Sequence, residues 1–346
     1  RGLGTIWFAL ALFALSLVLL TNKQENAYIG AIAILILGYG DGLAGLIGSY
    51  FGKRKLGINK KSFEGSIVMF VMSFLVSALI FSLVVASSNI LYYSFFTAVL
   101  ATMIEIFSPH GTDNLFLPLG ITLGVYALVT FNWFYPISIA FTVTSVIVYI
   151  SMVLKKLTPI ATIGALILGT AVYSFAGPYV YWAMILFFVS STILEMYHNK
   201  PESKKVKNIS SIIQNGLPCL LFSIMYYFIG NDMILTACFV SIAGATSDTW
   251  ASGLGYYSKE KVKSILTWKQ LPKGESGGVT KLGLLGSFFG AFFIGIFSLF
   301  IPGNNVVMRF IIILVFGFIT SILDSLFGIL LQAKYYVFYY YKYNTC

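Results

Sequence analysis

Long apolar runs dominate this sequence and restrict what the chain can fold into. About 20 apolar residues are enough for a helix to cross a bilayer, and a helix satisfies its backbone polar groups internally. Only 10% of the residues are charged, against about 25% in a soluble domain. We therefore predict an all-α, polytopic membrane protein with two tandem bundles. Its twelve spans are expected at residues 3–21, 27–50, 66–86, 89–107, 115–131, 134–154, 159–177, 179–197, 211–229, 232–254, 282–301 and 306–331.

The basic residues divide unevenly between the two sides of the membrane. If the twelve spans alternate in direction, 20 of the 22 lysines and arginines fall on one side, and only Lys23 and Arg309 fall opposite. Because positive residues accumulate in cytoplasmic loops, we predict a multi-pass cell-membrane protein whose basic, active face is cytoplasmic. This topology explains most of the net charge of +10 without a nucleic-acid partner.

Seven of the twelve carboxylates fall at the predicted cytoplasmic ends of even-numbered spans or in the loops that follow. A carboxylate near the membrane interior is costly and usually faces a functional cavity; a helix cap or a salt bridge is the alternative for each one alone. We predict two cavities. The first would contain Asp41, Glu64, Glu105 and Asp113, and the second Asp248, Glu275 and Asp324.

Carboxylates and lysines in one cavity suit Mg²⁺ and phosphate, because Mg²⁺ binds few carboxylates and keeps phosphate oxygens as ligands. Phosphoryl transfer then needs mainly positioning and charge neutralisation. We expect Asp41, Asp113, Asp248 and Asp324 to hold the metal. The expected catalytic residues are Asp41, Glu64, Glu105, Asp248, Glu275 and Asp324.

A short internal repeat relates the two halves of the chain. The stretch GDGLAGLIGSYFGK (40–53) aligns with SDTWASGLGYYSK (247–259), which pairs Asp41 with Asp248. Downstream, KKSFEGS (60–66) aligns with PKGESGG (272–278), so each copy has lysine, glutamate and small residues in a loop. Both copies have the same polarity, which indicates a parallel duplication rather than the inverted repeat common in transporters.

These motifs carry a resemblance to known families. Residues 1–131 resemble the CTP-dependent lipid-alcohol kinases, phytol kinase and dolichol kinase, through GDGLAGLIGSYFGK, KKSFEGSIVMF, Glu105 and DNLFLPLG. Residues 155–346 are similar to the phytyl-phosphate kinases, through LTPIATIGALILG, SDTWASGLGYYSK, LPKGESGGVTKLGLLGS and SILDSLFGILLQAKY. Residues 132–154 would be a connecting helix. Compared with these families, the first domain is expected to be incomplete at its N-terminus and the second at its C-terminus.

The resemblance implies a fusion of two consecutive kinase activities. One would phosphorylate an isoprenoid alcohol such as phytol, geranylgeraniol or a polyprenol, and the other would phosphorylate the monophosphate, with Mg²⁺ and CTP or another nucleoside triphosphate. Glycines in the loops would let backbone N–H groups approach a phosphate, and lysines would add positive charge. The expected nucleotide-binding residues are Lys53, Lys61, Ser62, Gly65, Asn114, Lys259, Lys273, Gly277 and Gly278.

Three alternatives remain at this point. A CTP-dependent lipid cytidylyltransferase would share metal, nucleotide and topology, but its product would carry CMP. A transporter would need a polar path to both faces, and the far side offers only four charged residues: Lys23, Glu25, Asp232 and Arg309. One half could also be a degenerate scaffold.

Overall fold

The computed structural model describes residues 3–21, 26–56, 61–85, 88–109, 111–197, 206–272, 275, 277–303 and 305–330. Two compact units divide the chain. Unit 1 comprises Arg1–Ser174 and Lys204–Leu217, and unit 2 comprises Phe175–Ser203 and Pro218–Cys346. The division falls at residue 174, so the helix expected at 132–154 belongs to unit 1.

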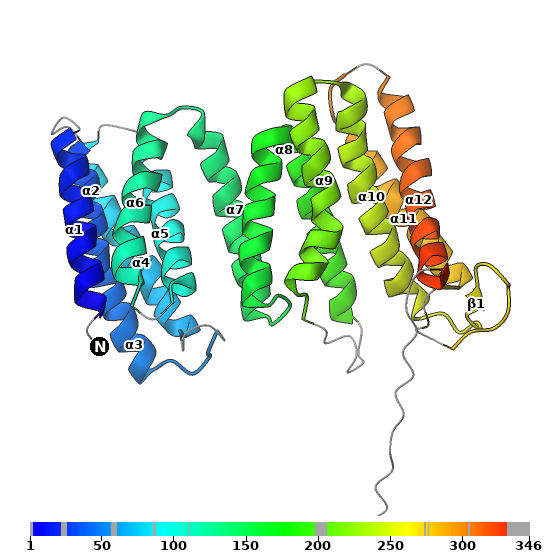
Figure 1. The fold of residues 1–346 in the computed structure, drawn as a ribbon, viewed down its shortest axis with the longest axis horizontal. Helices are drawn as coiled ribbons and strands as arrows, with labels where there is room; N and C mark the ends of the chain where they lie inside the picture. The colour runs from blue at the N-terminus through cyan, green and yellow to red at the C-terminus, as the bar shows by residue number, and fades with distance from the viewer. Residues whose placement is uncertain are drawn as a thin grey trace, which may run out of the picture. The chain divides into compact units, whose positions relative to one another are not determined.

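Unit 1 is a bundle of helices that run alongside one another (Figure 1, blue to green). The second span is one run in three parts, because a π-helical segment, η2, separates two α-helical segments and ends at Asp41. The elements that lie wholly in unit 1 are α1 (Leu3–Thr21), α2 (Ala27–Leu35), η2 (Ile36–Asp41), α3 (Gly42–Tyr50), α4 (Phe63–Val84), α5 (Ile90–Phe107), α6 (Asp113–Thr130) and α7 (Phe134–Val153).

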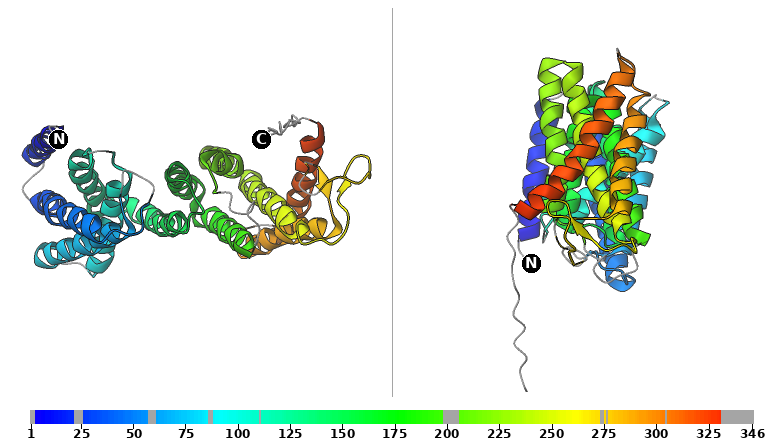
Figure 2. Two further views of the ribbon diagram at one scale, coloured as in Figure 1. Left: turned by 90° about the horizontal axis from the view of Figure 1, so that it is seen from below. Right: turned by 90° about the vertical axis from the view of Figure 1, so that its right-hand side faces the viewer.

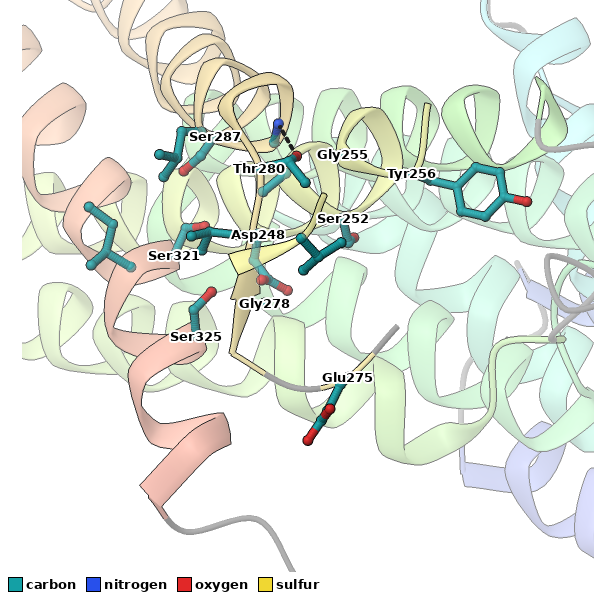
Figure 3. A pocket seen from close by; sticks show the side chains of 16 residues that line it. Asp248, Ser252, Gly255, Tyr256, Glu275, Gly278, Thr280, Ser287, Ser321 and Ser325 are labelled. Atoms are coloured by element: carbon teal, nitrogen blue, oxygen red, sulfur yellow. Dashed lines mark hydrogen bonds between the residues drawn. The ribbon is translucent and has the colours of Figure 1, made fainter. Parts of the chain in front are cut away.

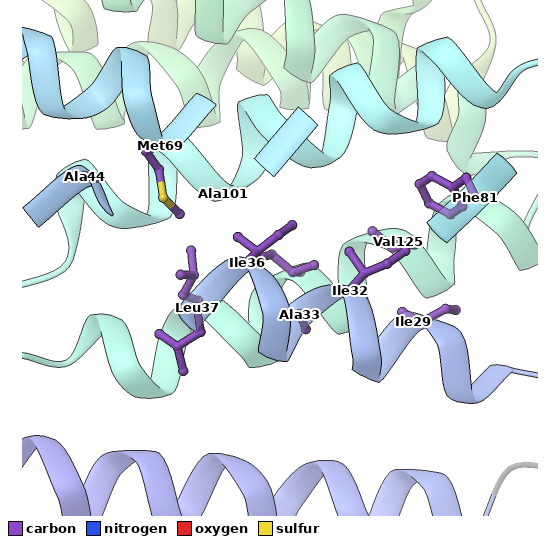
Figure 4. Packing of buried hydrophobic residues seen from close by; sticks show 12 residues of the cluster. Ile29, Ile32, Ala33, Ile36, Leu37, Ala44, Met69, Phe81, Ala101 and Val125 are labelled. Atoms are coloured by element: carbon purple, nitrogen blue, oxygen red, sulfur yellow. The ribbon is translucent and has the colours of Figure 1, made fainter. Parts of the chain in front are cut away.

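The core of unit 1 lies where α2 and η2 pack against α4, α5 and α6 (Figure 4). Ile29, Ile32 and Ile36 recur at the three- and four-residue spacing of one helix face, and each is at most 2% exposed. Met69 of α4 and Val125 of α6 are fully buried against them. This packing fixes the direction of the segment that carries Asp41.

Unit 2 contains the end of α8 (Pro159–Tyr197), most of α9 (Ile209–Ile229), then α10 (Asp232–Gly255), α11 (Lys281–Ser298) and α12 (Val306–Leu330). Between α10 and α11, a loop carries the short antiparallel strands β1 (Lys263–Ser264) and β2 (Gly278–Val279). Figure 2 shows this loop beside the ends of α11 and α12. The loop therefore covers one end of the α10–α12 group.

The structure confirms an all-α, polytopic membrane protein, while the number twelve is not confirmed. In the described part of the chain, nine helices are long and apolar enough to cross a membrane. Helix α8 counts once among them although it contains the break predicted between residues 177 and 179, because Gly177 has φ 77° and Pro178 follows. Pro118 does not interrupt α6, which is continuous from Asp113 to Thr130.

Candidate functional site

In unit 1, α3 and the start of α4 cross in close contact. Ser62 is the N-cap of α4, and its hydroxyl accepts a hydrogen bond from the Gly65 N–H at 3.2 Å. Such a side-chain cap satisfies one of the free donors at a helix start. A Cβ added at Gly65 would lie 3.0 Å from the Ala44 carbonyl oxygen and 3.4 Å from the Gly48 Cα. Glycine therefore allows the two helices to meet backbone to backbone.

Unit 2 repeats this crossing between α10 and α11. Thr280 is the N-cap of α11 and accepts from the Gly283 N–H at 3.0 Å. A Cβ added at Gly283 would lie 3.1 Å from the Ala251 carbonyl oxygen and 3.5 Å from the Gly255 Cα. The distances match those of unit 1 contact for contact. The pairing of residues 40–53 with 247–259 is thus matched by the same local geometry in both units.

The second part of the predicted alignment was wrong in register. The crossing makes Thr280 the counterpart of Ser62, and Gly283 the counterpart of Gly65. Val279, not Lys273, then takes the place of Lys61. Both loops contain Lys, Glu and Gly, which suggested that the two lysines correspond, whereas the helix start is what the two units share.

Lys61 is held by the short loop that joins α3 to α4. Its carbonyl accepts from the Leu56 N–H at 3.0 Å, and the Phe63 N–H donates to the Arg54 carbonyl at 2.9 Å. Lys55 and Ser62 form an isolated antiparallel bridge between these bonds. The loop thus closes like a hairpin and places the Lys61 side chain at the crossing.

Three carboxylates from three segments surround the Lys61 ammonium. The Nζ atom lies 2.6 Å from Glu105 Oε1 of α5, 3.3 Å from Asp113 Oδ2 of α6 and 4.0 Å from Asp41 Oδ1 of η2. The Glu105 and Asp113 side chains are only 5% and 13% exposed. We call these four residues the Lys61 cluster. One ammonium and three carboxylates leave a formal charge of −2 when all are ionised.

Electrostatics keep the Lys61 amine charged. Burial alone would lower its pKa, but the carboxylates of Glu105, Asp41 and Asp113 outweigh that effect and raise the pKa above its ordinary value. The amine is therefore protonated at neutral pH. It occupies the position between the carboxylates that a metal ion would take, so a metal would have to bind beside the amine or replace it.

Unit 2 holds a pocket of about 280 Å³ at its counterpart position, between α10, the β1–β2 loop, α11 and α12 (Figure 3). The Asp248 side chain lies in it, and Figure 3 shows the Glu275 carboxylate directed away from Asp248. Hydroxyl groups supply most of the other polar lining: Ser252, Tyr256, Thr280, Ser287, Ser321 and Ser325. Among the described lining residues there is no lysine, arginine or histidine.

Asp324 of α12 does not line this pocket, but its carboxylate interacts electrostatically with that of Asp248. The described residues contain no group of three or more Asp, Glu, His or Cys side chains arranged to hold a metal ion. Mg²⁺ needs only one or two carboxylates when phosphate oxygens complete its shell. Asp248 and Asp324 fit that requirement better than the Lys61 cluster, since no described ammonium lies between them.

Several predicted residues have structural roles. The Glu64 carboxylate accepts from the Arg54 N–H at 3.3 Å and is not a partner of Lys61. The Asn114 amide donates to the Gly4 carbonyl at 3.3 Å and so connects α6 to α1. We expected the Gly278 N–H to bind a phosphate. In the structure it donates instead to the Glu275 carbonyl at 3.2 Å.

Other predicted residues lie outside the two sites. A Cβ on Gly277 would overlap Ile329 of α12, so this glycine (φ 78°) serves the packing of the loop. Lys53 and Lys259 are exposed in the loops that follow α3 and α10. Lys273 lies outside the described residues. The catalytic, metal and nucleotide roles of all these residues stay predictions.

The sequence analysis missed the hydroxyl groups at both sites. Ser321 and Ser325 are one helical turn apart on α12, and both line the unit 2 pocket. Asp324 lies between them in the sequence. Tyr149 of α7 stacks on Phe63 beside the Lys61 cluster, with ring centroids 6.2 Å apart. Serine at a four-residue spacing next to a carboxylate was a usable signal, whereas one tyrosine in an apolar span carried none.

Comparisons with known proteins place the chain in a family. The model for the integral membrane protein family DUF92 matches residues 142–342. An uncharacterized membrane protein of Methanocaldococcus jannaschii is 32% identical over 199 residues, which cover 55% of this chain and 82% of that protein. No solved structure matches the chain.

Two more distant relatives are named phytol kinases. One, from Synechocystis sp., is 37% identical over 100 residues, or 28% of this chain and 43% of that protein. The other, named probable chloroplastic phytol kinase, from Triticum aestivum, is 36% identical over 80 residues, or 23% of this chain and 25% of that protein. The chain thus spans less than half of either kinase. With more than half of its own length matched by the family model, this chain belongs to the DUF92 family of integral membrane proteins.

Proposed function

We propose that this protein transfers a phosphoryl group from a nucleoside triphosphate to an isoprenoid alcohol and to its monophosphate, at the cytoplasmic side of a membrane. The observation that carries the proposal is the repeated crossing, which brings an aspartate, Asp41 or Asp248, to a polar site at helix ends in each unit. The names of the phytol kinase relatives support the same chemistry.

We assign the two steps to the two units by their charge. In unit 1, Lys61 compensates part of the carboxylate charge, and its ammonium can also attract the γ-phosphate of a nucleotide. In unit 2, Asp248 and Asp324 would hold Mg²⁺, which when bound neutralises phosphate oxygens during transfer. An acceptor that is itself a phosphate needs such a cation more than a neutral alcohol does. Unit 1 is therefore assigned to the alcohol and unit 2 to the monophosphate.

The experiment uses purified full-length protein in lipid nanodiscs. Geranylgeraniol or geranylgeranyl monophosphate is incubated with Mg²⁺ and with each radiolabelled nucleotide, CTP, UTP, ATP or GTP, in turn. We expect label from the γ-phosphate in a monophosphate and a diphosphate, respectively. Label from the nucleoside instead would identify a cytidylyltransferase-type product, and no labelled lipid with any nucleotide would refute the proposal.

A further inference from the structure

The two carboxylate oxygens of Glu105 have different surroundings. Oε1 is 2.6 Å from the Lys61 ammonium. Oε2 is buried, as is Glu105 as a whole, which is only 4% exposed. This oxygen has no hydrogen-bond partner among the described residues. A buried carboxylate oxygen without a donor is costly. The arrangement therefore leaves one acceptor unsatisfied at the most buried carboxylate of the cluster.

A second unsatisfied oxygen belongs to Tyr149 of α7. Its hydroxyl is buried and interacts electrostatically with Glu105, and it makes no hydrogen bond of suitable geometry within the described structure. Ser66, which lies beside it, already donates its hydroxyl proton to the Ser62 carbonyl at 3.1 Å. The Tyr149 ring is fixed by stacking on Phe63. The Ser66 oxygen beside it could accept, but no described residue is in hydrogen-bond geometry with Tyr149 Oη, which is thus a positioned donor.

Tyr149 has exposed apolar neighbours on its own helix. Val146 and Ile150, on the same helix, have exposed fractions of 38% and 51%, and α7 is a candidate membrane span. In a membrane span, exposed apolar side chains of this kind can face lipid. A ligand with an apolar chain along this face of α7 would have to place a polar group at its end to meet the two unsatisfied oxygens.

We infer that Glu105 Oε2 and Tyr149 Oη bind the hydroxyl group of a long-chain alcohol, which donates to the carboxylate and accepts from the tyrosine. This inference rests on the proposed function of unit 1 and specifies its acceptor site. A hydroxyl satisfies both oxygens at once, because it is donor and acceptor together. A phosphate would bring a further negative charge beside a carboxylate and fits this position poorly.

The same geometry gives each group a part in the reaction. The alcohol oxygen forms a bond to the γ-phosphorus, while the bond from that phosphorus to the bridging oxygen breaks and its electron pair leaves on the nucleoside diphosphate. The hydroxyl proton passes to Glu105 Oε2. Lys61, on Oε1, favours the ionised form of the carboxylate that accepts this proton. Tyr149 is a positioning residue, because it holds the oxygen without exchanging a proton.

The experiment measures binding without nucleotide, so its readout does not depend on activity. Tritiated geranylgeraniol is titrated onto wild-type protein and onto Tyr149→Phe in nanodiscs, and the unfolding midpoint of each is recorded. Loss of a neutral hydrogen bond should weaken binding roughly fivefold. Because the hydroxyl removed is buried and makes no hydrogen bond of suitable geometry with the described residues, the unfolding midpoint should stay equal or rise.

Tyr92→Phe is the matched control, since the Tyr92 hydroxyl is 2.6 Å from Ser138 Oγ. It should lower the unfolding midpoint and leave the alcohol affinity unchanged. Glu105→Gln should also weaken alcohol binding, which provides a second variant on the other side of the hydroxyl.

The outcomes separate this inference from the proposed function. Equal affinity in wild type, Tyr149→Phe and Glu105→Gln would mean that the two oxygens bind only water and would overturn the inference. Weaker alcohol binding in both variants supports the site even if no nucleotide yields a phosphorylated lipid. In that case the kinase proposal fails and the alcohol site stands.

Discussion

The two units use one backbone arrangement to hold different charges. In unit 1, the residue before the N-cap of α4 is Lys61, whose ammonium contacts three carboxylates. In unit 2, the residue before the N-cap of α11 is Val279, and the space beside it is a pocket with Asp248 and several hydroxyl groups. A single position thus decides whether the site carries its own cation.

This comparison shows that the two units share the helix crossing and differ in their charged side chains. Backbone contacts at the glycines need a fixed geometry in both units, because a Cβ there would approach a carbonyl oxygen within about 3 Å. The charged side chains take no part in these backbone contacts, so they can differ between the units. Substitutions at the crossing should therefore affect both units equally. Substitutions of the charged residues should affect one unit and not the other.

The largest expected effect is a loss of one reaction step per variant. Asp41→Asn should lower the rate of alcohol phosphorylation about 10²–10³-fold, and Asp248→Asn the rate of monophosphate phosphorylation by a similar factor, because each removes a charge that stabilises the transition state. Rates are measured with alcohol and monophosphate as separate substrates. Asp232→Asn, at the other end of α10, is the control. If each variant loses both steps, the units build one site together.

The second effect concerns the Lys61 cluster. Lys61→Met should destabilise the protein by about 3 kcal/mol, because it leaves buried carboxylates without their cation. Reversible unfolding in mixed micelles measures the change. Lys281→Met removes a lysine from an exposed pair with Glu260, 86% and 52% exposed at 3.7 Å, and should change nothing measurable. Equal effects of the two variants would show that the cluster is no more than a surface ion pair.

The third effect should be the same in both units. Gly65→Ala and Gly283→Ala each place a Cβ about 3 Å from a carbonyl oxygen and should cost about 1–3 kcal/mol of stability through overpacking. Gly42→Ala is the control, because no described atom outside its own stretch of helix lies within 4 Å of the added Cβ, and alanine favours a helix. A large cost in one unit alone would contradict the common crossing.

The smallest effect tests the two N-caps. Ser62→Ala and Thr280→Ala should each cost about 1 kcal/mol, because each removes the side chain that accepts from a helix N–H. Thr280→Ser, which keeps the hydroxyl, should recover most of the loss in the same unfolding measurement. A neutral Ser62→Ala would mean that water or the loop satisfies the Gly65 N–H equally well.

Composition and hydropathy were sufficient to predict the fold class. The apolar runs predicted the helices and the break in α8, where the structure has Gly177 and Pro178, two residues that disfavour a continuous helix. The carboxylates near helix ends marked the region where Asp41, Glu105 and Asp113 meet. Each of these signals involves residues that are close in the sequence, so it can be recognised in a single sequence.

The rest depended on contacts between distant segments. The sequence could not show that Lys61 lies between three carboxylates, because that requires the exact packing of α4, α5 and α6. It also could not distinguish a glycine that approaches a phosphate from one that packs on a neighbouring helix, as Gly277 does on Ile329. Likewise, the amide of Asn114 was assigned to a ligand although it bonds to α1.

The π-helical segment before Asp41 has a consequence for the phase of the helix. Such a segment is usually one inserted residue in an α-helix, often at a functional site, and α10 reaches Asp248 without one. The wider turn takes up such a residue, so Asp41 keeps the orientation relative to the core face of α2 that a regular α-helix one residue shorter would give it. The two aspartates thus reach corresponding positions from helices that are wound differently before them, and a single-codon deletion in η2 that restored a regular α-helix would leave Asp41 directed at Lys61.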